Sequence, residues 1–159
     1  MKVIRKSVFE TNSSSTHSIK INEGDKLTSS LLGKNGVHYV ECEEFGWERT
    51  EYYDAETKLS YIITYLMKDI KDEEDVSNYL NSDEKRKEYF EKIKKAVKEH
   101  TGLDIKIIKN NRSWFPYGYV DHQSHCVPLD VISGTVDDIK NFIFNPNVEL
   151  IIDNDNNYY

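Results

Sequence analysis

Apolar and polar residues alternate near both ends of the chain, whereas apolar residues recur at helical spacing in between. Alternation over residues 2–10, 18–21 and 37–42 predicts three strands in the first part of the chain. From Asp54 onward apolar residues recur every three or four positions and form one stripe: Leu59, Ile62, Ile63, Leu66, Met67 and Ile70. This spacing predicts an amphipathic helix that buries one face.

A second helix is predicted up to Glu99, after a short helical turn over residues 76–80. Ser82 or Asp83 can cap its start, and Gly102 can end it because glycine accepts the left-handed conformation that closes many helices. Its apolar stripe is short: Phe90, Ile93 and Val97. Lysines and glutamates share the other faces at pairing distance, which is typical of a solvated helix surface.

The alternating pattern returns after this helix. Residues 103–108 and 117–121 predict two strands, and residues 148–152 predict a last one. Between them Thr135, followed by Asp138, has the form of a capped helix start. Strands at both ends with helices between them predict an α+β fold, with a mixed or antiparallel sheet and about three helices packed on it.

The length of 159 residues is that of one ordinary domain. We predict a single α+β domain over residues 1–152 and a frayed polar tail over residues 153–159, which holds mainly Asp, Asn and Tyr. No apolar stretch is long enough to cross a bilayer. The two cysteines, Cys42 and Cys126, lie far apart in a chain without a signal segment, so we expect reduced thiols and a cytoplasmic protein.

The net charge of −7 disfavours nucleic acid as the main partner, because phosphate backbones are usually met by a basic surface. No Gly-rich phosphate loop, nucleophile elbow or kinase signature is present. Cys-x-x-Cys and His-Glu-x-x-His spacings are absent too, so we predict no metal site. The sequence assigns no cofactor.

One block of polar residues joins the first two predicted strands. It contains Thr11, Asn12, Ser13, Ser14, Ser15 and Thr16, directly before His17. Backbone amides and hydroxyls in such a loop can bind an anion, and His17 can act as an acid or base near neutral pH. The alternative is a hairpin in which the hydroxyls satisfy only their own backbone.

A second polar block runs from Tyr119 to Cys126. If this block were a strand, Asp121 and Gln123 would share one face, and His122 and Ser124 the other. An Asp beside a His can orient its ring for acid–base catalysis. The alternative is the solvated end of a strand.

A third block, residues 41–48, places carboxylates, Glu44 among them, around a bend that ends at Trp47. Together with histidines such carboxylates can ligate a divalent metal, but no ligand spacing here is diagnostic.

Residues 9–18, with the sequence FETNSSSTHS, resemble a family of small uncharacterised proteins encoded by phages and Gram-positive bacteria. Residues 44–48, 58–61 and 117–124 are similar to the same family, so the resemblance covers most of the chain in four blocks. It implies a phage or prophage setting and no particular activity. Four polar and aromatic blocks favour one shared pocket, with Glu44 and Lys58 at its border.

Two functions are consistent with these patterns. In the first, a polar pocket binds a small nucleotide-like or phosphorylated ligand. Hydrolysis would use His17, His122 and Asp121. Contacts to the ligand would come from residues 11–16 together with Glu44, Trp47, Lys58, Tyr119, Gln123 and Ser124. In the second, the chain is a non-enzymatic phage inhibitor that binds a host or defence protein through acidic and tyrosine-rich surface. Buried, converging histidines would favour the first function, whereas an exposed patch of aromatic and acidic residues of roughly several hundred square ångströms would favour the second.

Overall fold

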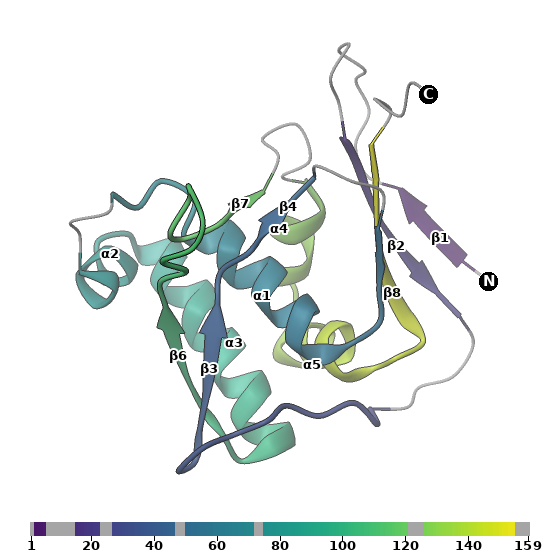
Figure 1. Cartoon of the computed structure of the whole chain (residues 1–159). Coiled ribbons are helices and arrows are strands. Elements are labelled where there is room, and N and C mark those ends of the chain that lie inside the picture. Colours follow the sequence, from purple (N-terminus) through teal and green to yellow (C-terminus); the bar gives the residue numbers. More distant parts are fainter. Residues whose placement is uncertain are drawn as a thin grey trace.

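A four-stranded antiparallel sheet forms one side of the molecule. The computed structural model describes residues 2–5, 15–22, 27–46, 50–71, 75–120 and 126–154. In the sheet, β1 (Lys2–Arg5), β2 (Ser15–Ile21), β8 (Val148–Asn154) and β5 (Thr50–Tyr52) lie side by side in that order (Figure 1). The last described strand therefore occupies the middle of the sheet, between two strands from the first third of the chain.

Two short parallel pairs form a second layer. β3 (Val37–Glu41) pairs with β6 (Asp104–Ile108), and β4 (Glu44–Phe45) pairs with β7 (Tyr119–Val120) in the same direction. The two pairs follow one another along the chain, so they resemble one parallel ladder interrupted on both strands. On one strand the interruption is Cys42 and Glu43, and on the other it is the loop of residues 109–118.

Helix α1 (Ala55–Leu66) lies between the two layers (Figure 1). The sequence predicted one buried stripe, but ten of its twelve residues are buried. Its polar side chains are accommodated by the interrupted ladder: Ser60 Oγ donates to the Glu41 carbonyl at 2.7 Å, and Thr64 Oγ1 accepts from the Glu43 amide at 3.2 Å. These bonds satisfy backbone groups that the ladder leaves unpaired and fix the break between β3 and β4.

Four further helices complete the described fold: α2 (Val76–Asn81), α3 (Glu84–Thr101), α4 (Cys126–Ile132) and α5 (Val136–Phe144). Their ends follow local signals. Asp83 accepts from the Arg86 amide at the start of α3, and Gly102 closes this helix with φ 75°. Thr135 and Asp138 form the predicted capping box of α5. The α+β class and these helix ends are confirmed.

Helix α4 was not predicted. The sequence pattern was interpreted as a strand from Tyr119 to Cys126, but the described strand β7 covers Tyr119–Val120, and Cys126 already begins α4. Pro128 is tolerated in the helix because the first turn needs no amide donor from it. At the end of the chain, β8 runs to Asn154, two residues beyond the predicted strand. None of the helices in the described ranges is long and apolar enough to cross a membrane.

Candidate functional site

Many of the predicted site residues lie outside the described residues: Thr11, Asn12, Ser13, Ser14, Trp47, Asp121, His122, Gln123 and Ser124. Ser15, Thr16 and His17 are described by their backbone only; they begin β2 and pair with Asn154, Asp153 and Ile152 of β8. The acid–base roles of His17, His122 and Asp121 therefore stay predictions.

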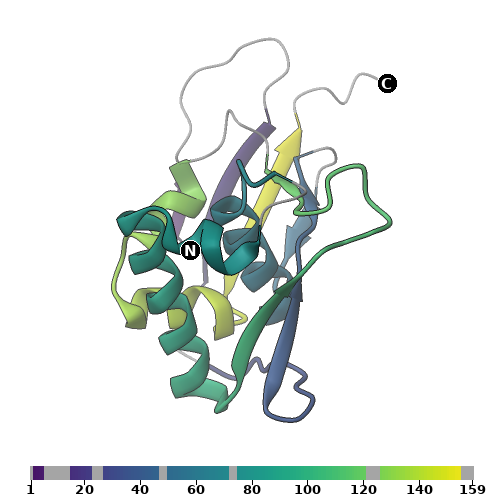
Figure 2. The same ribbon diagram turned by 90° about the vertical axis from the view of Figure 1, so that its left-hand side faces the viewer.

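The helix and strand ends that precede or follow the polar blocks in the sequence lie at one end of the molecule. β2 begins there, β4 and β7 end there, and α4 starts there, at the upper end in both Figures 1 and 2. The fold thus brings together described backbone next to residues 11–14, 47–49 and 121–125.

The fold places two of the predicted site residues, Glu44 and Tyr119, side by side on neighbouring strands. They are partners in the β4–β7 pair, and the Tyr119 amide donates to the Glu43 carbonyl at 3.0 Å. The Glu44 carboxylate accepts from the Ser113 hydroxyl, which ties the strand to the loop of residues 109–118. The Tyr119 ring stacks on Phe115 with 5.3 Å between ring centroids.

Lys58 lies in the core, apart from these residues. Its side chain is 0% exposed, and Nζ donates to the carbonyls of Asn145 at 2.9 Å and Val148 at 3.0 Å. Val148 is the first residue of β8, and the partner of His17 on this strand is Ile152. The distance along the strand from Val148 to Ile152 is about 13 Å. Burial lowers the pKa of Lys58 to about 8. Its contacts fix the turn from α5 into β8.

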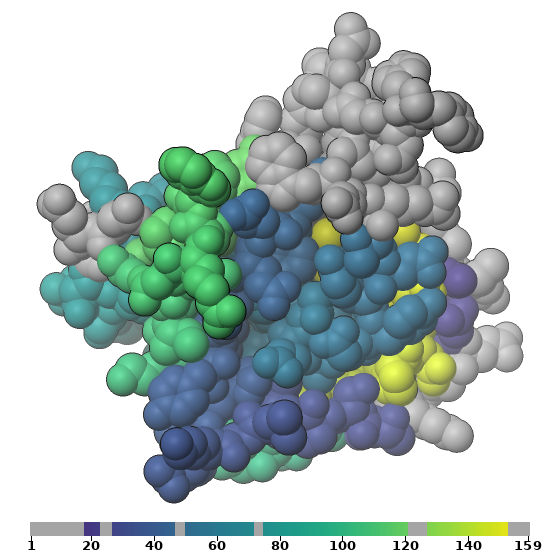
Figure 3. Space-filling view, viewed as in Figure 1, coloured from purple at the N-terminus to yellow at the C-terminus, as the bar shows by residue number. Residues whose placement is uncertain are grey.

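The loop of residues 109–118, here called the aromatic loop, is held by its own hydrogen bonds. The Asn110 amide donates to the Pro116 carbonyl at 2.8 Å, and the Gly118 amide donates to the Phe115 carbonyl at 2.8 Å. The Phe115 amide donates to Ser113 Oγ at 3.0 Å. The loop stands away from the helices and strands in Figure 2 and forms a green ridge beside β3 and β4 in Figure 3.

This loop presents large aromatic rings to solvent. Trp114 is 97% exposed and Phe115 is 42% exposed, although such side chains usually contribute to a core. Beside them is a hollow of about 360 Å³, here called the aromatic hollow, lined by Met67, Lys68, Asp69, Ile70 and residues 114–120. A Trp-Phe pair in a polar turn was the sequence signal that could have identified this surface.

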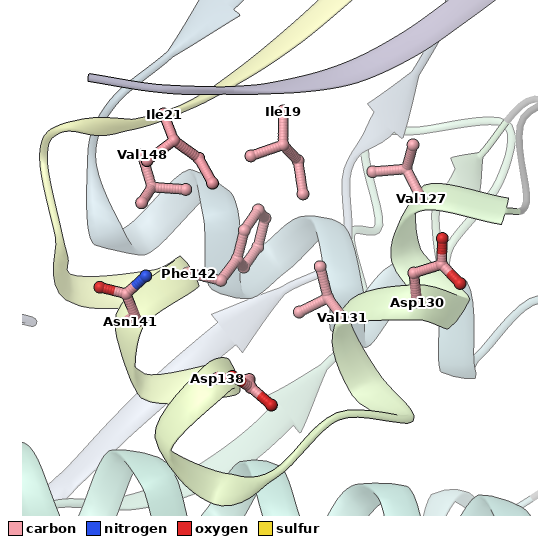
Figure 4. A pocket seen from close by; sticks show the side chains of 9 residues that line it. All are labelled: Ile19, Ile21, Val127, Asp130, Val131, Asp138, Asn141, Phe142 and Val148. Carbon is pink, nitrogen blue, oxygen red and sulfur yellow. The ribbon is translucent and has the colours of Figure 1, made fainter. Parts of the chain in front are cut away.

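A second depression lies between β2, α4 and α5 and is here called the apolar groove (Figure 4). Its volume is about 190 Å³. Its apolar lining comes from β2, α4, α5 and β8 and consists of Ile19, Ile21, Val127, Val131, Phe142 and Val148. Asp130, Asp138 and Asn141 are the polar residues at its edge. Ile19 follows His17 by two positions, and Val127 follows the block at residues 121–125, so two predicted polar blocks adjoin this groove along the chain.

Among the residues with described side chains, no three His, Cys, Asp or Glu groups come together as they would around a metal ion. Cys42 is buried, and burial raises the pKa of its thiol to about 12, which makes a thiolate ligand or nucleophile unfavourable there.

No protein-family model, curated protein or solved structure matches this chain. The features from which a function can be inferred are the aromatic hollow, the apolar groove and the placement of Glu44 and Tyr119.

Proposed function

We propose that the chain binds a small nucleotide-like ligand in the aromatic hollow. The observation that carries this proposal is the exposure of Trp114 and Phe115 on a braced loop beside a hollow of about 360 Å³. Every nucleobase has a flat π-face, and stacking on an aromatic side chain contributes roughly 1–3 kcal/mol per base. Pockets for small ligands begin at about this volume.

The polar groups at the hollow suit the other parts of a nucleotide. Lys68 offers an ammonium for a phosphate, and the carboxylate of Asp69 can accept from the amino or imino groups of a base. Arg112, on the exposed part of the loop, adds a second cation. The net charge of −7 favours a short ligand over a long polyanion.

The polar blocks predicted from the sequence would supply the groups for hydrolysis. His17 and His122 would transfer protons and Asp121 would orient a ring, as expected from the sequence. Hydrolysis of a bound nucleotide should then disappear in a His17→Ala, His122→Ala double variant that still binds it. If binding and hydrolysis are both unchanged in this variant, these histidines have no catalytic role.

Trp114 provides the direct test of binding. The chain has two tryptophans, so a Trp47→Phe background leaves Trp114 as the reporter of its own surroundings. Titration with AMP, GMP, CMP and UMP should quench its fluorescence saturably, because a stacked base contacts the indole. In the natural sequence, Trp114→Ala should weaken binding about 5- to 150-fold, which corresponds to the loss of one stacking contact.

Leu32 is the matched control, because it is 86% exposed and lies outside the lining of the hollow. Leu32→Ala should leave the affinity and the ligand-induced rise in melting temperature unchanged. Absence of saturable quenching with all four nucleotides would exclude the nucleotide-binding proposal.

A second function, binding of a host or defence protein, is favoured by one specific observation. Trp114 is 97% exposed, and tryptophan and arginine are the residue types most enriched at the energetic centre of protein interfaces. Here the aromatic loop would insert into a groove of the partner. A protein retained from host lysate by the natural chain and by Leu32→Ala, but not by Trp114→Ala, would support this function. Equal retention of that protein by the natural chain and by Trp114→Ala would count against this function.

A further inference from the structure

The apolar groove is lined largely by side chains of the hydrophobic core. Four of its lining residues are almost completely buried, with exposed fractions of 3% for Val127, 8% for Val131, 3% for Phe142 and 2% for Val148. These side chains belong to the core and cannot move aside freely, since they pack in a close-packed interior. A volume of about 190 Å³ is comparable to an apolar cavity that accepts a benzene-sized molecule.

The edge of the groove is acidic. Figure 4 shows Asp130 on the α4 side and Asp138 on the α5 side of the apolar residues. Asp138 uses one oxygen, Oδ2, to accept from the Thr135 amide at 2.8 Å and the Thr135 hydroxyl at 2.9 Å. Its second oxygen, Oδ1, is left for another donor. These bonds from Thr135 also lower the pKa of Asp138, which keeps the carboxylate ionised at neutral pH.

Two lysines, Lys92 of α3 and Lys140 of α5, are engaged elsewhere. Lys92 Nζ donates to the Gly134 carbonyl at 2.8 Å, and Lys140 Nζ lies 2.9 Å from Glu99 and 3.6 Å from Asp137. Among the residues with described side chains, no lysine or arginine lies within 4.0 Å of the Asp138 carboxylate. Asp138 Oδ1, a charged oxygen beside the apolar groove, thus has no ion-pair partner among these side chains.

We propose that the apolar groove binds a small amphipathic cation, namely a primary amine on an aryl or short alkyl body. The body would displace water from Ile19, Val131 and Phe142, which is favourable because apolar surface is removed from water. The ammonium would donate to Asp138 Oδ1 as a charge-assisted hydrogen bond. The site lies apart from the aromatic hollow, with no lining residue in common, so it is independent of the proposed nucleotide binding.

Three probes of similar size and different charge test this proposal. Phenethylamine, phenethyl alcohol and phenylacetate share the aryl body, and their affinities can be compared by ligand-observed NMR on the full chain. The amine should bind about 5- to 10-fold more tightly than the alcohol, as expected for one partly exposed charge-assisted bond, and phenylacetate should bind most weakly. Equal affinities of amine and carboxylate would overturn the proposal.

Two variants assign the binding to this groove. Asp138→Asn retains an oxygen that can cap α5 but removes the charge, so the amine should bind no better than the alcohol. Val131→Phe fills the groove and should abolish binding of all three probes. Asp138→Asn is informative even if Val131→Phe does not fold, and unchanged amine affinity in Asp138→Asn would show that the carboxylate is not the recognition group. Loss of nucleotide binding in the Trp114 experiment would leave these outcomes unaffected.

Discussion

Replacing Lys58 by alanine is expected to lower the free energy of unfolding by about 3–5 kcal/mol. The substitution removes a long side chain that is 0% exposed and leaves a cavity beside Phe142, whose ring centroid lies 5.9 Å from Nζ. It also leaves the carbonyls of Asn145 and Val148 without the ammonium that now donates to them. Equilibrium unfolding in urea measures this loss.

One further variant separates packing from charge at this position, and a lysine on α3 provides a control. Lys58→Met keeps most of the side-chain volume and removes the ammonium, so it should cost less than Lys58→Ala. Lys95 is the matched lysine control, since it is 65% exposed on α3 and lies 3.9 Å from Glu99; its replacement by alanine should change stability by less than about 0.5 kcal/mol. A Lys58→Ala variant as stable as the Lys95→Ala variant would contradict the assigned core role.

The pH dependence of stability gives an independent check on Lys58. Its pKa is about 8 in the folded protein and 10.5 in the unfolded reference, so between these values the unfolded chain binds more protons. The contribution of Lys58 to stability therefore increases as pH rises from 8 to 10.5, by an amount on the order of 3 kcal/mol. Subtracting the profile of Lys58→Met removes the opposite effect of Cys42, whose raised pKa makes its contribution fall with rising pH.

Replacing Gly118 by alanine is expected to cost about 2–4 kcal/mol of stability. Gly118 has φ 74°, and a Cβ there would lie 2.4 Å from the Glu43 carbonyl oxygen and 2.6 Å from Cγ2 of Thr64. The carbonyl is backbone that also accepts from the Tyr119 amide at 3.0 Å, so it cannot move without loosening the β4–β7 pair. We expect the aromatic loop to shift, which NMR of the Trp114 indole would detect.

Gly36 provides the matched control for this effect. It has φ 78°, but nothing lies within 4 Å of a Cβ built on it. Gly36→Ala should therefore carry only the conformational cost, about 1–2 kcal/mol, and leave the Trp114 signal in place. Equal losses in the two variants would mean that the close approach to Glu43 contributes nothing.

Features that depend on neighbouring residues could be predicted from the sequence. Asp83, Gly102 and the Thr135–Asp138 pair mark helix ends through bonds to residues a few positions away, and they occur as expected. Helix α4 was missed because its seven residues, Cys126–Ile132, are too few to show a helical apolar period and include Pro128 in the first turn.

Features that depend on distant residues could not be predicted. Burial of Lys58 requires carbonyls of the α5–β8 turn, and burial of Ser60 and Thr64 requires the break between β3 and β4. Likewise, the pairing of Glu44 with Tyr119 depends on a parallel ladder whose two strands are separated along the chain by three helices. Trp114 would be assigned to a core by residue type, yet the fold leaves it in solvent.

The central place of β8 has a consequence for synthesis on the ribosome. β2 and β5 make no ladder with each other, and both pair with β8, which is translated long after them. The acceptors of Lys58, at Asn145 and Val148, also emerge late. A nascent chain can form α1, α3 and the β1–β2 pair early, but β5 can join the sheet only after residues 148–154 have left the exit tunnel. Until then the edges of β2 and β5 that pair with β8 are open to chaperones.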